Sequence, residues 1–364
     1  MKIVVIGTRG FPGILGGVET HAEELYPRIA SKGHDVTVIR RSPYVNDSNR
    51  VSEHNGVRLV DIYAPKKKSF EAITHTFLGV LKARSLNPDI LHIHAIGPGL
   101  LAPFARLLGL KVVVTNHGPD YNRQKWGPLA KTILKLGERF GTLTANKVIV
   151  ISQTIANILA SKYGRKDTVL IFNGVNRPQI PKSTSWIQKW GVDGPYIVAA
   201  GRFVKEKGFH DLIEAYRKSN LSDRFQLVIA GDADHPDEYS ESLKRQARQN
   251  GVILTGFIKG EPMVQLMANA SLFVIPSYHE GLPITLLEAM SYGIDVLASD
   301  IDANKIKELN PSTDFFKTGD IGALSEALVR KLANPQKRTY DLSAYDWDNI
   351  ASQTIEVYAS ILNK

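Results

Sequence analysis

The feature that most constrains the fold of this chain is an alternation of short apolar runs, rich in β-branched residues, with segments of helical periodicity. In the first half of the chain the apolar runs lie at residues 2–6, 35–40, 90–93, 111–115 and 147–151. Helical patterns separate several of them, at residues 19–31, 74–85 and 128–143. Because the runs do not alternate polar with apolar residues, they are typical of strands buried on both faces. Buried strands separated by helices predict βαβ units and a parallel sheet.

The pattern breaks near residues 174–195 and then starts again. A second series of apolar runs lies at residues 196–200, 226–230, 252–255, 272–275 and 295–298. Helical patterns accompany it at residues 209–218, 238–249, 261–269, 284–292, 321–333 and 347–362. We therefore predict two tandem, doubly wound α/β domains at residues 1–175 and 196–345, with a linker at 176–195 and a last helix at 346–364. Ligands of such sheets bind beyond the carboxyl ends of the strands, so we expect the site in a cleft between the domains.

Several common chemistries are excluded by what the sequence lacks. Without cysteine the chain has no disulfide, no thiolate metal site and no cysteine nucleophile. The sequence lacks the Gly-x-Gly-x-x-Gly motif of NAD-binding proteins and the Walker motif. It also lacks the His-Glu-x-x-His motif of zinc-dependent hydrolases and the Gly-x-Ser-x-Gly motif of serine hydrolases. These absences argue against NAD binding and against both classes of hydrolase. His92 and His94 lie on one predicted strand, and we expect their rings to point to opposite sides and to share no metal ion. We therefore expect neither a metal ion nor a resident cofactor.

The positive charge of the chain is concentrated in its first half. Residues 1–175 contain 24 Lys and Arg against 12 Asp and Glu, whereas residues 176–364 contain 21 against 24. A basic domain can face nucleic acid, an anionic membrane or a phosphorylated substrate. Its charges cluster at residues 66–68 and at Arg123, Lys125, Lys131, Lys135 and Arg139. Because this half shows no interleaved exposed aromatic residues and no RNA-binding motif, we expect no nucleic-acid partner.

The strongest chemical signal lies where the run at residues 272–275 continues through residues 276–283 into a helix. Gly281 lets the backbone approach a ligand closely, and Pro283 fixes the backbone where the helix begins. The N–H groups at such a helix start have no partner within the helix and favour an anion. We expect three of them to point to a ligand, those of Leu282, Ile284 and Thr285.

Charged side chains accompany this loop and an earlier strand end. One carboxylate of the pair Glu280 and Glu288 could bind sugar hydroxyls and the other a ribose diol. The alternative is that Glu280 caps the helix and Glu288 is an ordinary surface residue. Arg202 and Lys207 follow the run at residues 196–200 and could hold a diphosphate. Their alternative role is that of exposed loop charges paired with Glu206.

The first domain offers two weaker signals. A glycine-rich loop at residues 7–17 joins the first strand to the first helix, where backbone N–H groups favour phosphate. The alternative is a turn that contains several glycines. His117 follows the run at residues 111–115 and could face the reacting centre, although a lone histidine is more often structural.

Taken together, these residues resemble the group-one family of retaining, nucleotide-sugar-dependent glycosyltransferases with the GT-B fold. The resemblance spans nearly the whole chain, and its most specific part is Glu280 and Glu288 within Pro-Ser-x-x-Glu-Gly-Leu-Pro and the following helix. The other matching positions are Arg202, Lys207, Gly16, Gly17 and His117. The opening segment, residues 6–12 through Gly-Gly-Val-Glu-Thr, further resembles a bacterial subgroup that includes rhamnosyltransferases of surface polysaccharides.

The resemblance implies a role for each matching position. Glu280 would contact the donor sugar and Glu288 the ribose. The diphosphate would be held by Arg202, Lys207 and the amides of Gly16 and Gly17. The base would be framed by Gly256, Phe257 and Ile258. The family often has Gly-Gly after Ser-Asp, but here Ser299-Asp300 is followed by Ile301-Asp302-Ala303-Asn304, which is a departure on the sugar side. The family also places the last helix back on the first domain.

The expected function is the retaining, metal-independent transfer of a hexosyl or deoxyhexosyl group from a nucleotide-diphosphate sugar. The acceptor would be a glycan or lipid-linked glycan in cell-surface polysaccharide synthesis. No secretory signal or membrane-spanning run is visible, so we expect a cytoplasmic enzyme, or one peripheral at the inner face of the membrane. Two alternatives are a nucleotide-sugar 2-epimerase of the same fold and a catalytically silent sugar-nucleotide-binding protein.

Overall fold

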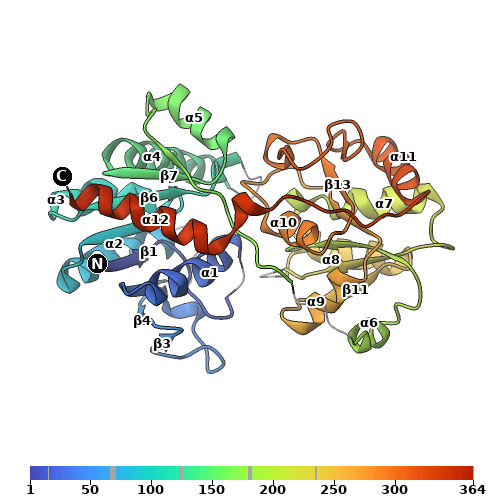
Figure 1. The fold of residues 1–364 in the computed structure, drawn as a ribbon, viewed down its shortest axis with the longest axis horizontal. Coiled ribbons are helices and arrows are strands. Elements are labelled where there is room, and N and C mark those ends of the chain that lie inside the picture. Colours follow the sequence, from blue (N-terminus) through green and yellow to red (C-terminus); the bar gives the residue numbers. More distant parts are fainter. Residues whose placement is uncertain (15, 66–70, 123–125, 179–182, 234–235, 364) are drawn as a thin grey trace. The chain divides into compact units, whose positions relative to one another are not determined.

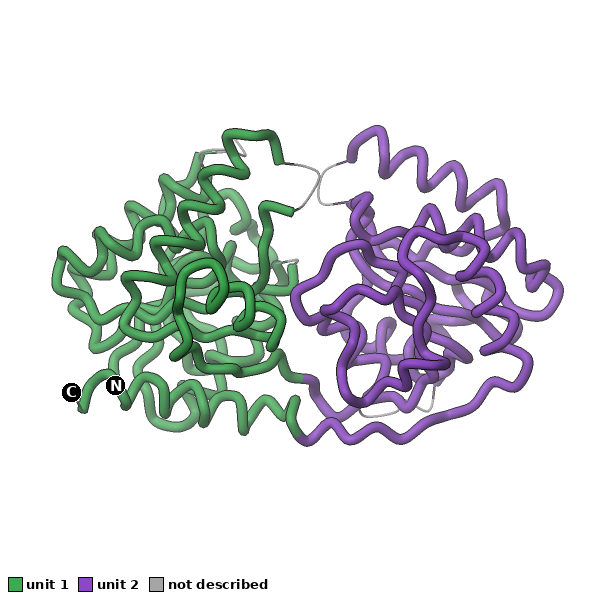
Figure 2. The backbone as a smooth tube through the Cα atoms, turned by 90° about the horizontal axis from the view of Figure 1, so that it is seen from above, with its two compact units in different colours: residues 1–174, 344–364 green, residues 175–343 purple. Residues whose placement is uncertain are grey.

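The computed structural model describes residues 1–14, 16–65, 71–122, 126–178, 183–233 and 236–363. It divides the chain into two compact units, which Figure 2 shows in green and purple. Unit 1 contains Met1–Gly174 and Ala344–Lys364, and unit 2 contains Val175–Ser343. None of the helices in the described part of the chain is long and apolar enough to cross a membrane.

Unit 1 is built on an eight-stranded sheet in the order β3-β4-β2-β1-β5-β6-β7-β8. The strands are β1 Lys2–Ile6, β2 Asp35–Arg41, β3 Glu53–His54, β4 Val57–Ile62, β5 Ile90–His94, β6 Val112–Asn116, β7 Lys147–Val150 and β8 Val169–Leu170. Neighbouring strands are parallel, except that β3 pairs with β4 in the antiparallel direction. The central strands β1, β5 and β6 are almost entirely buried, and their burial includes the polar residues His92, His94, Thr115 and Asn116.

Helices cover both faces of this sheet (Figure 1). They are α1 Gly17–Ser31, α2 Glu71–Leu86, α3 Ala102–Leu107, α4 Pro128–Thr144, α5 Gln153–Tyr163 and α12 Trp347–Leu362. On one face, α1 and α12 pack together over Ile3 and Val5 of β1. On the other face, Gly79 of α2 lies against Ile6 and Gly141 of α4 against Val114.

Helix α12, red in Figure 1, is part of unit 1 although it follows unit 2 in the sequence. It starts at a capped end, where the Asp346 carboxylate accepts a hydrogen bond from the Asn349 amide at 2.9 Å. Trp347, Tyr358 and Ile361 are buried in the same core as Tyr26 of α1. The core of unit 1 is therefore incomplete without these last residues.

Unit 2 is built on a six-stranded parallel sheet in the order β11-β10-β9-β12-β13-β14. The strands are β9 Tyr196–Ala200, β10 Gln226–Ala230, β11 Ile253–Gly256, β12 Leu272–Ile275, β13 Val296–Ser299 and β14 Phe315–Phe316. The helices are α6 Ser185–Lys189, α7 Phe209–Ser219, α8 Glu238–Gln249, α9 Glu261–Ala268, α10 Ile284–Ser291 and α11 Ile321–Leu332. Alternate residues of β9 enter two cores, one with α7, α8 and α11 and one with α9 and α10.

Each sheet has one point at which its strand order reverses. In unit 1 the chain adds β2 on one side of β1 and β5 on the other. In unit 2 it adds β10 on one side of β9 and β12 on the other. The loops that leave adjacent strands there turn to opposite faces, which opens the carboxyl edge to ligands. The residues that follow β1 and β5, and those that follow β9 and β12, are therefore the first places to look for a site.

Candidate active site

The reversal point of unit 2 brings together two of the expected side chains. Lys207 follows β9 and Glu280 follows β12, and Lys207 Nζ lies 2.6 Å from Glu280 Oε1. The Ser277 hydroxyl donates to the same carboxylate oxygen at 2.7 Å. The Lys207 and Glu280 side chains are only 19% and 11% exposed, so this charge-assisted hydrogen bond is well shielded from water. The two groups hold each other in a fixed place at the edge of the sheet.

The two loops that carry this ion pair are in backbone contact. Gly208 has a φ of +67°, and a Cβ atom there would lie 2.1 Å from the carbonyl oxygen of Pro276. The Tyr278 amide donates to the Glu206 carbonyl at 2.8 Å. Only glycine permits this approach, because any side chain at residue 208 would strike the neighbouring loop. The loop after β9 and the loop after β12 therefore form one structural piece.

Residues at and after the end of β13 support the loop after β12 through hydrogen bonds. The Ser299 hydroxyl, at the end of β13, donates to the Ser277 carbonyl at 2.6 Å. The Asn304 amide donates to the Ser299 carbonyl at 3.0 Å, and Ser277, Ser299 and Asn304 are all fully buried. Asn304 belongs to the segment that departs from the family's Gly-Gly. Sequence reasoning missed these supporting residues because serine and asparagine carry no local signal of a buried hydrogen bond.

Helix α10 starts next to the ion pair and offers backbone amides. Its N-cap is Pro283, which supplies no side-chain hydrogen bond to the helix. The amides of Leu286 and Leu287 donate back to the Pro283 carbonyl, so Ile284 and Thr285 stand in the first turn ahead of them. Such a helix end attracts an anion. Leu282 is buried directly before the cap.

The remaining expected residues of unit 2 lie on neighbouring elements. Arg202 follows β9 and is partly buried, and Glu288 is partly buried on α10. Gly256 ends β11 and accepts a hydrogen bond from the Gly231 amide at 2.9 Å. Phe257, the next residue, is 47% exposed, and Lys259 Nζ lies over its ring, 5.9 Å from the ring centroid. The ligand contacts expected of these residues, and of Gly281 and Ile258, stay predictions.

In unit 1 the glycine-rich loop follows β1 and is organised by a carboxylate. Gly7 has a φ of +101°, and a Cβ atom there would lie 2.2 Å from the carbonyl oxygen of His94. Gly16, with a φ of +143°, leaves room for Glu19, whose other carboxylate oxygen accepts from the Arg9 amide at 3.0 Å. Helix α1 then begins at Gly17. Leu15 lies outside the described residues, and the buried role of Glu19 was not predicted.

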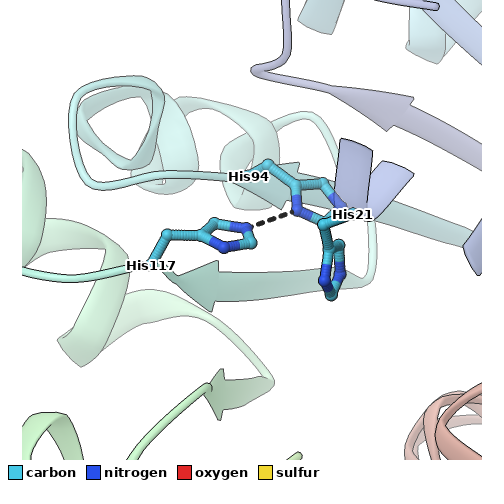
Figure 3. A group of neighbouring side chains, drawn as sticks. All are labelled: His21, His94 and His117. Atoms are coloured by element: carbon cyan, nitrogen blue, oxygen red, sulfur yellow. Dashed lines mark hydrogen bonds between the residues drawn. The ribbon is translucent and has the colours of Figure 1, made fainter. Parts of the chain in front are cut away.

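His117 follows β6 and belongs to a cluster of histidines (Figure 3). His117 Nε2 lies 2.9 Å from His94 Nδ1, and His21 packs edge-on against both rings. The prediction that the rings of His92 and His94 point to opposite sides was wrong, because the two rings stack with centroids 4.3 Å apart. Residues two apart on a strand point to the same face, which is the physical reason.

Burial keeps these imidazoles neutral. It lowers the pKa of His92 to about 3 and that of His21 to about 4. Burial and the neighbouring imidazoles hold the pKa of His94 and of His117 well below the usual range. One nitrogen from each of His21, His94 and His117 lies within 4.8 Å of the others, a spacing that a metal ion could use. The nitrogens of His94 and His117 lie 2.9 Å apart, a distance at which one ring donates a hydrogen bond to the other when no metal ion is bound.

Comparison with known proteins decides the family. The family described as Glycosyl transferases group 1 matches residues 182–343, and Glycosyltransferase Family 4 matches residues 15–178. The chain belongs to the group 1 glycosyltransferases. The prediction of a glycosyltransferase from the sequence is thereby confirmed.

Three relatives illustrate the reach of this similarity. The glycosyltransferase is 26% identical to an uncharacterized glycosyltransferase of Methanocaldococcus jannaschii, with 98% of each chain covered. It is 28% identical to a protein of Bacillus subtilis named for teichuronic acid biosynthesis, over 71% of this chain and 65% of that protein. The solved structure of Anabaena HepE with UDP and glucose is 17% identical, with a TM-score of 0.80 over 99% of this chain and 100% of that one. The expected GT-B fold is confirmed.

Proposed function

We propose that this glycosyltransferase moves a hexosyl or deoxyhexosyl group, with retention of configuration, from a nucleotide-diphosphate sugar to a glycan or lipid-linked glycan of the cell surface. The observation that carries the proposal is the Lys207–Glu280 pair at the reversal point of unit 2. Support for the donor class comes from HepE, which was solved with UDP and glucose. Support for the acceptor class comes from the B. subtilis relative named for teichuronic acid biosynthesis.

The proposed chemistry follows from where charge develops. As the glycosidic bond to the leaving diphosphate breaks, the sugar becomes cation-like and negative charge grows on the phosphate oxygens. Lys207, Arg202 and the amides at the start of α10 would stabilise that charge. The Lys207 ammonium is already held by Glu280, whose carboxylate is fixed in turn by the Ser277 hydroxyl, so little reorganisation is needed when the charge appears. Lys207 and Arg202 would stabilise the charge of the leaving diphosphate without a metal ion.

Retention would follow from attack on the same face that the diphosphate leaves. A phosphate oxygen of the donor would accept the proton of the acceptor hydroxyl, and the new glycosidic bond would form as the old one breaks. No enzyme nucleophile takes part in this scheme. In unit 1, Gly16 and Gly17 would offer their amides to a phosphate, and His117 would contact a sugar.

A donor panel tests the proposal. Purified protein is heated with UDP-, GDP-, ADP- and dTDP-sugars, and one donor is expected to raise the melting temperature, because a ligand at 100 times its Kd adds about 2.7 kcal/mol of stability. The donor that binds is then incubated with glycan acceptors, and the anomer of the product is read by NMR. Release of an epimer without acceptor would favour the 2-epimerase, and binding without any product would favour the silent binding protein. If no donor raised the melting temperature, the result would contradict the glycosyltransferase, the 2-epimerase and the silent binding protein alike.

We further propose that α4 places the enzyme on an anionic membrane surface. Four of its large apolar side chains are exposed, and their spacing of seven, four and three residues puts them on one face. They are Leu129, Leu136, Phe140 and Leu143. The exposed cations Lys135 and Arg139 lie beside this face. A helix with an exposed apolar stripe and flanking cations suits the interface of a lipid bilayer. Lys131, also on α4, is partly buried. The other expected basic residues, 66–68, Arg123 and Lys125, lie outside the described residues.

Vesicle sedimentation checks this. The variant Leu136→Ser/Phe140→Ser is expected to bind vesicles with anionic lipid at least tenfold more weakly than the wild type, because each lost apolar side chain removes about 1 kcal/mol or more of burial. Val329→Ser is the matched control, since Val329 is 46% exposed on α11 of unit 2. Binding that ignores anionic lipid, or that both variants weaken equally, would count against the proposal.

A further inference from the structure

Four fully buried side chains of unit 1 form a hydrogen-bonded chain that ends at His117. The Tyr358 hydroxyl, from α12, lies 2.6 Å from His92 Nδ1. The Tyr26 hydroxyl, from α1, contacts His92 Nδ1 at 3.0 Å and also His94 Nε2. His94 Nδ1 then lies 2.9 Å from His117 Nε2. The chain thus links the helical face of the sheet to its carboxyl edge.

Two further residues, Thr115 and Asn173, hold histidines of this cluster in place. His92 Nε2 lies 2.7 Å from the Thr115 hydroxyl on β6. His21, which packs against His94 and His117, is itself held by Asn173 at 3.0 Å. Both nitrogens of His92 and of His94 therefore have partners. With neutral rings, each imidazole must use one nitrogen as a donor and the other as an acceptor.

The direction of the protons follows from donor and acceptor strength. A phenol is a much stronger acid than a neutral imidazole N–H, and an imidazole nitrogen is a much stronger base than a phenol oxygen. The favoured order therefore has the Tyr26 hydroxyl donate to His94 Nε2. The Tyr26 oxygen can then accept the Nδ1–H of His92, which also points to the Tyr358 oxygen, while His92 Nε2 accepts from the Thr115 hydroxyl. His94 must then carry its proton on Nδ1, and it donates that proton to His117 Nε2.

We propose that Tyr26, His92, His94 and Tyr358 are positioning residues that hold His117 in one orientation and in the tautomer with its proton on Nδ1. His117 then offers its Nδ1–H as a hydrogen-bond donor and does not act as a base. This suits a residue placed next to a donor sugar or phosphate, whose oxygens accept hydrogen bonds. The part of the inference that concerns catalysis rests on the proposed function, while the tautomer itself does not.

The first test reads the tautomer directly. The full-length protein is labelled with ¹⁵N-histidine, and the imidazole nitrogen shifts of His94 and His117 are assigned by single histidine substitutions. We expect an Nδ1–H signal for both rings in the wild type. Tyr26→Phe removes the hydroxyl that donates to His94, and we expect its spectrum to show the Nε2–H tautomer for His94. An Nε2–H signal for His117 in the wild type would overturn the proposal.

The second test reads the consequence for the reaction. Tyr26→Phe is expected to lower kcat about tenfold with little change in the KM for the donor. Tyr216→Phe is the matched control, because it also removes one buried hydroxyl, bonded to the Phe225 carbonyl at 2.7 Å in unit 2. Equal rates for the two variants would overturn the positioning role. Failure of every donor to react would instead contradict the proposed function and leave the tautomer result standing.

A metal analysis completes the design. A stoichiometric metal ion in the purified protein, lost in His21→Ala and His117→Ala alike, would overturn the proton order, since the metal would occupy the lone pairs. A metal-free protein that shows the Nδ1–H signal supports it.

Discussion

Replacing Lys207 with alanine is expected to lower kcat by about 100- to 1,000-fold. Removal of one prearranged group that stabilises developing charge costs about 3–4 kcal/mol of transition-state stabilisation. Lys207 is held at 2.6 Å by Glu280 and lies at the reversal point of the sheet, where a ligand phosphate would bind. Initial rates at saturating donor give the effect, and Arg202→Ala is expected to behave in the same way.

The control for this experiment lies two residues away. Lys205 is in the same short helical turn, Lys205–Lys207, but its side chain is exposed. Lys205→Ala is therefore expected to keep near-normal turnover. The melting temperature of each variant shows whether the fold survives. Near-wild-type turnover of Lys207→Ala or Arg202→Ala would remove the basis of the donor-site assignment.

Replacing Gly208 with alanine is expected to destabilise unit 2 by about 3 kcal/mol or more. Part of this is the cost of a left-handed backbone, about 1–2 kcal/mol for a residue with a Cβ atom. The larger part is the clash with the Pro276 carbonyl oxygen at 2.1 Å, which forces two loops apart. Denaturant unfolding measures the loss, and the same displacement would separate Lys207 from Glu280.

Gly251 separates the two contributions. It has nearly the same backbone, with a φ of +64°, but a Cβ atom there would meet nothing within 4 Å. Gly251→Ala is therefore expected to cost only the backbone contribution, about 1–2 kcal/mol. If both variants lost the same stability, the close approach of the two loops could not be what holds this part of unit 2 together.

Much of the fold could be predicted from local pattern. Strands β9, β10 and β12 have the predicted boundaries, because their runs are buried on both faces and carry no polar interruption. Strand β4 was missed because the exposed residues Arg58 and Asp61 interrupt its apolar sequence, whereas the strands were predicted from uninterrupted apolar runs. Helix α5 was missed because polar residues interrupt its apolar stripe, and only two of its residues are fully buried.

The site was predictable in part for a similar reason. Residues that follow strands gather at the carboxyl edge of a parallel sheet, so the meeting of Lys207 and Glu280 could be expected from the sequence. Contacts between distant side chains could not. Tyr358 and His92 are 266 residues apart, and nothing near either one in the sequence signals their hydrogen bond. The hydrogen bond from the Arg9 amide to the buried carboxylate of Glu19 likewise has no signal in the sequence.

The position of α12 has a consequence for how the protein is made. On the ribosome, residues 1–174 emerge first, but the helix that completes their core emerges only after residues 175–343. Unit 2 is continuous in sequence and can fold as soon as it has left the exit tunnel. The half that is synthesised first is thus the half that finishes folding last. Until then, the apolar surface that α12 will cover beside α1 stays exposed and can be bound by chaperones.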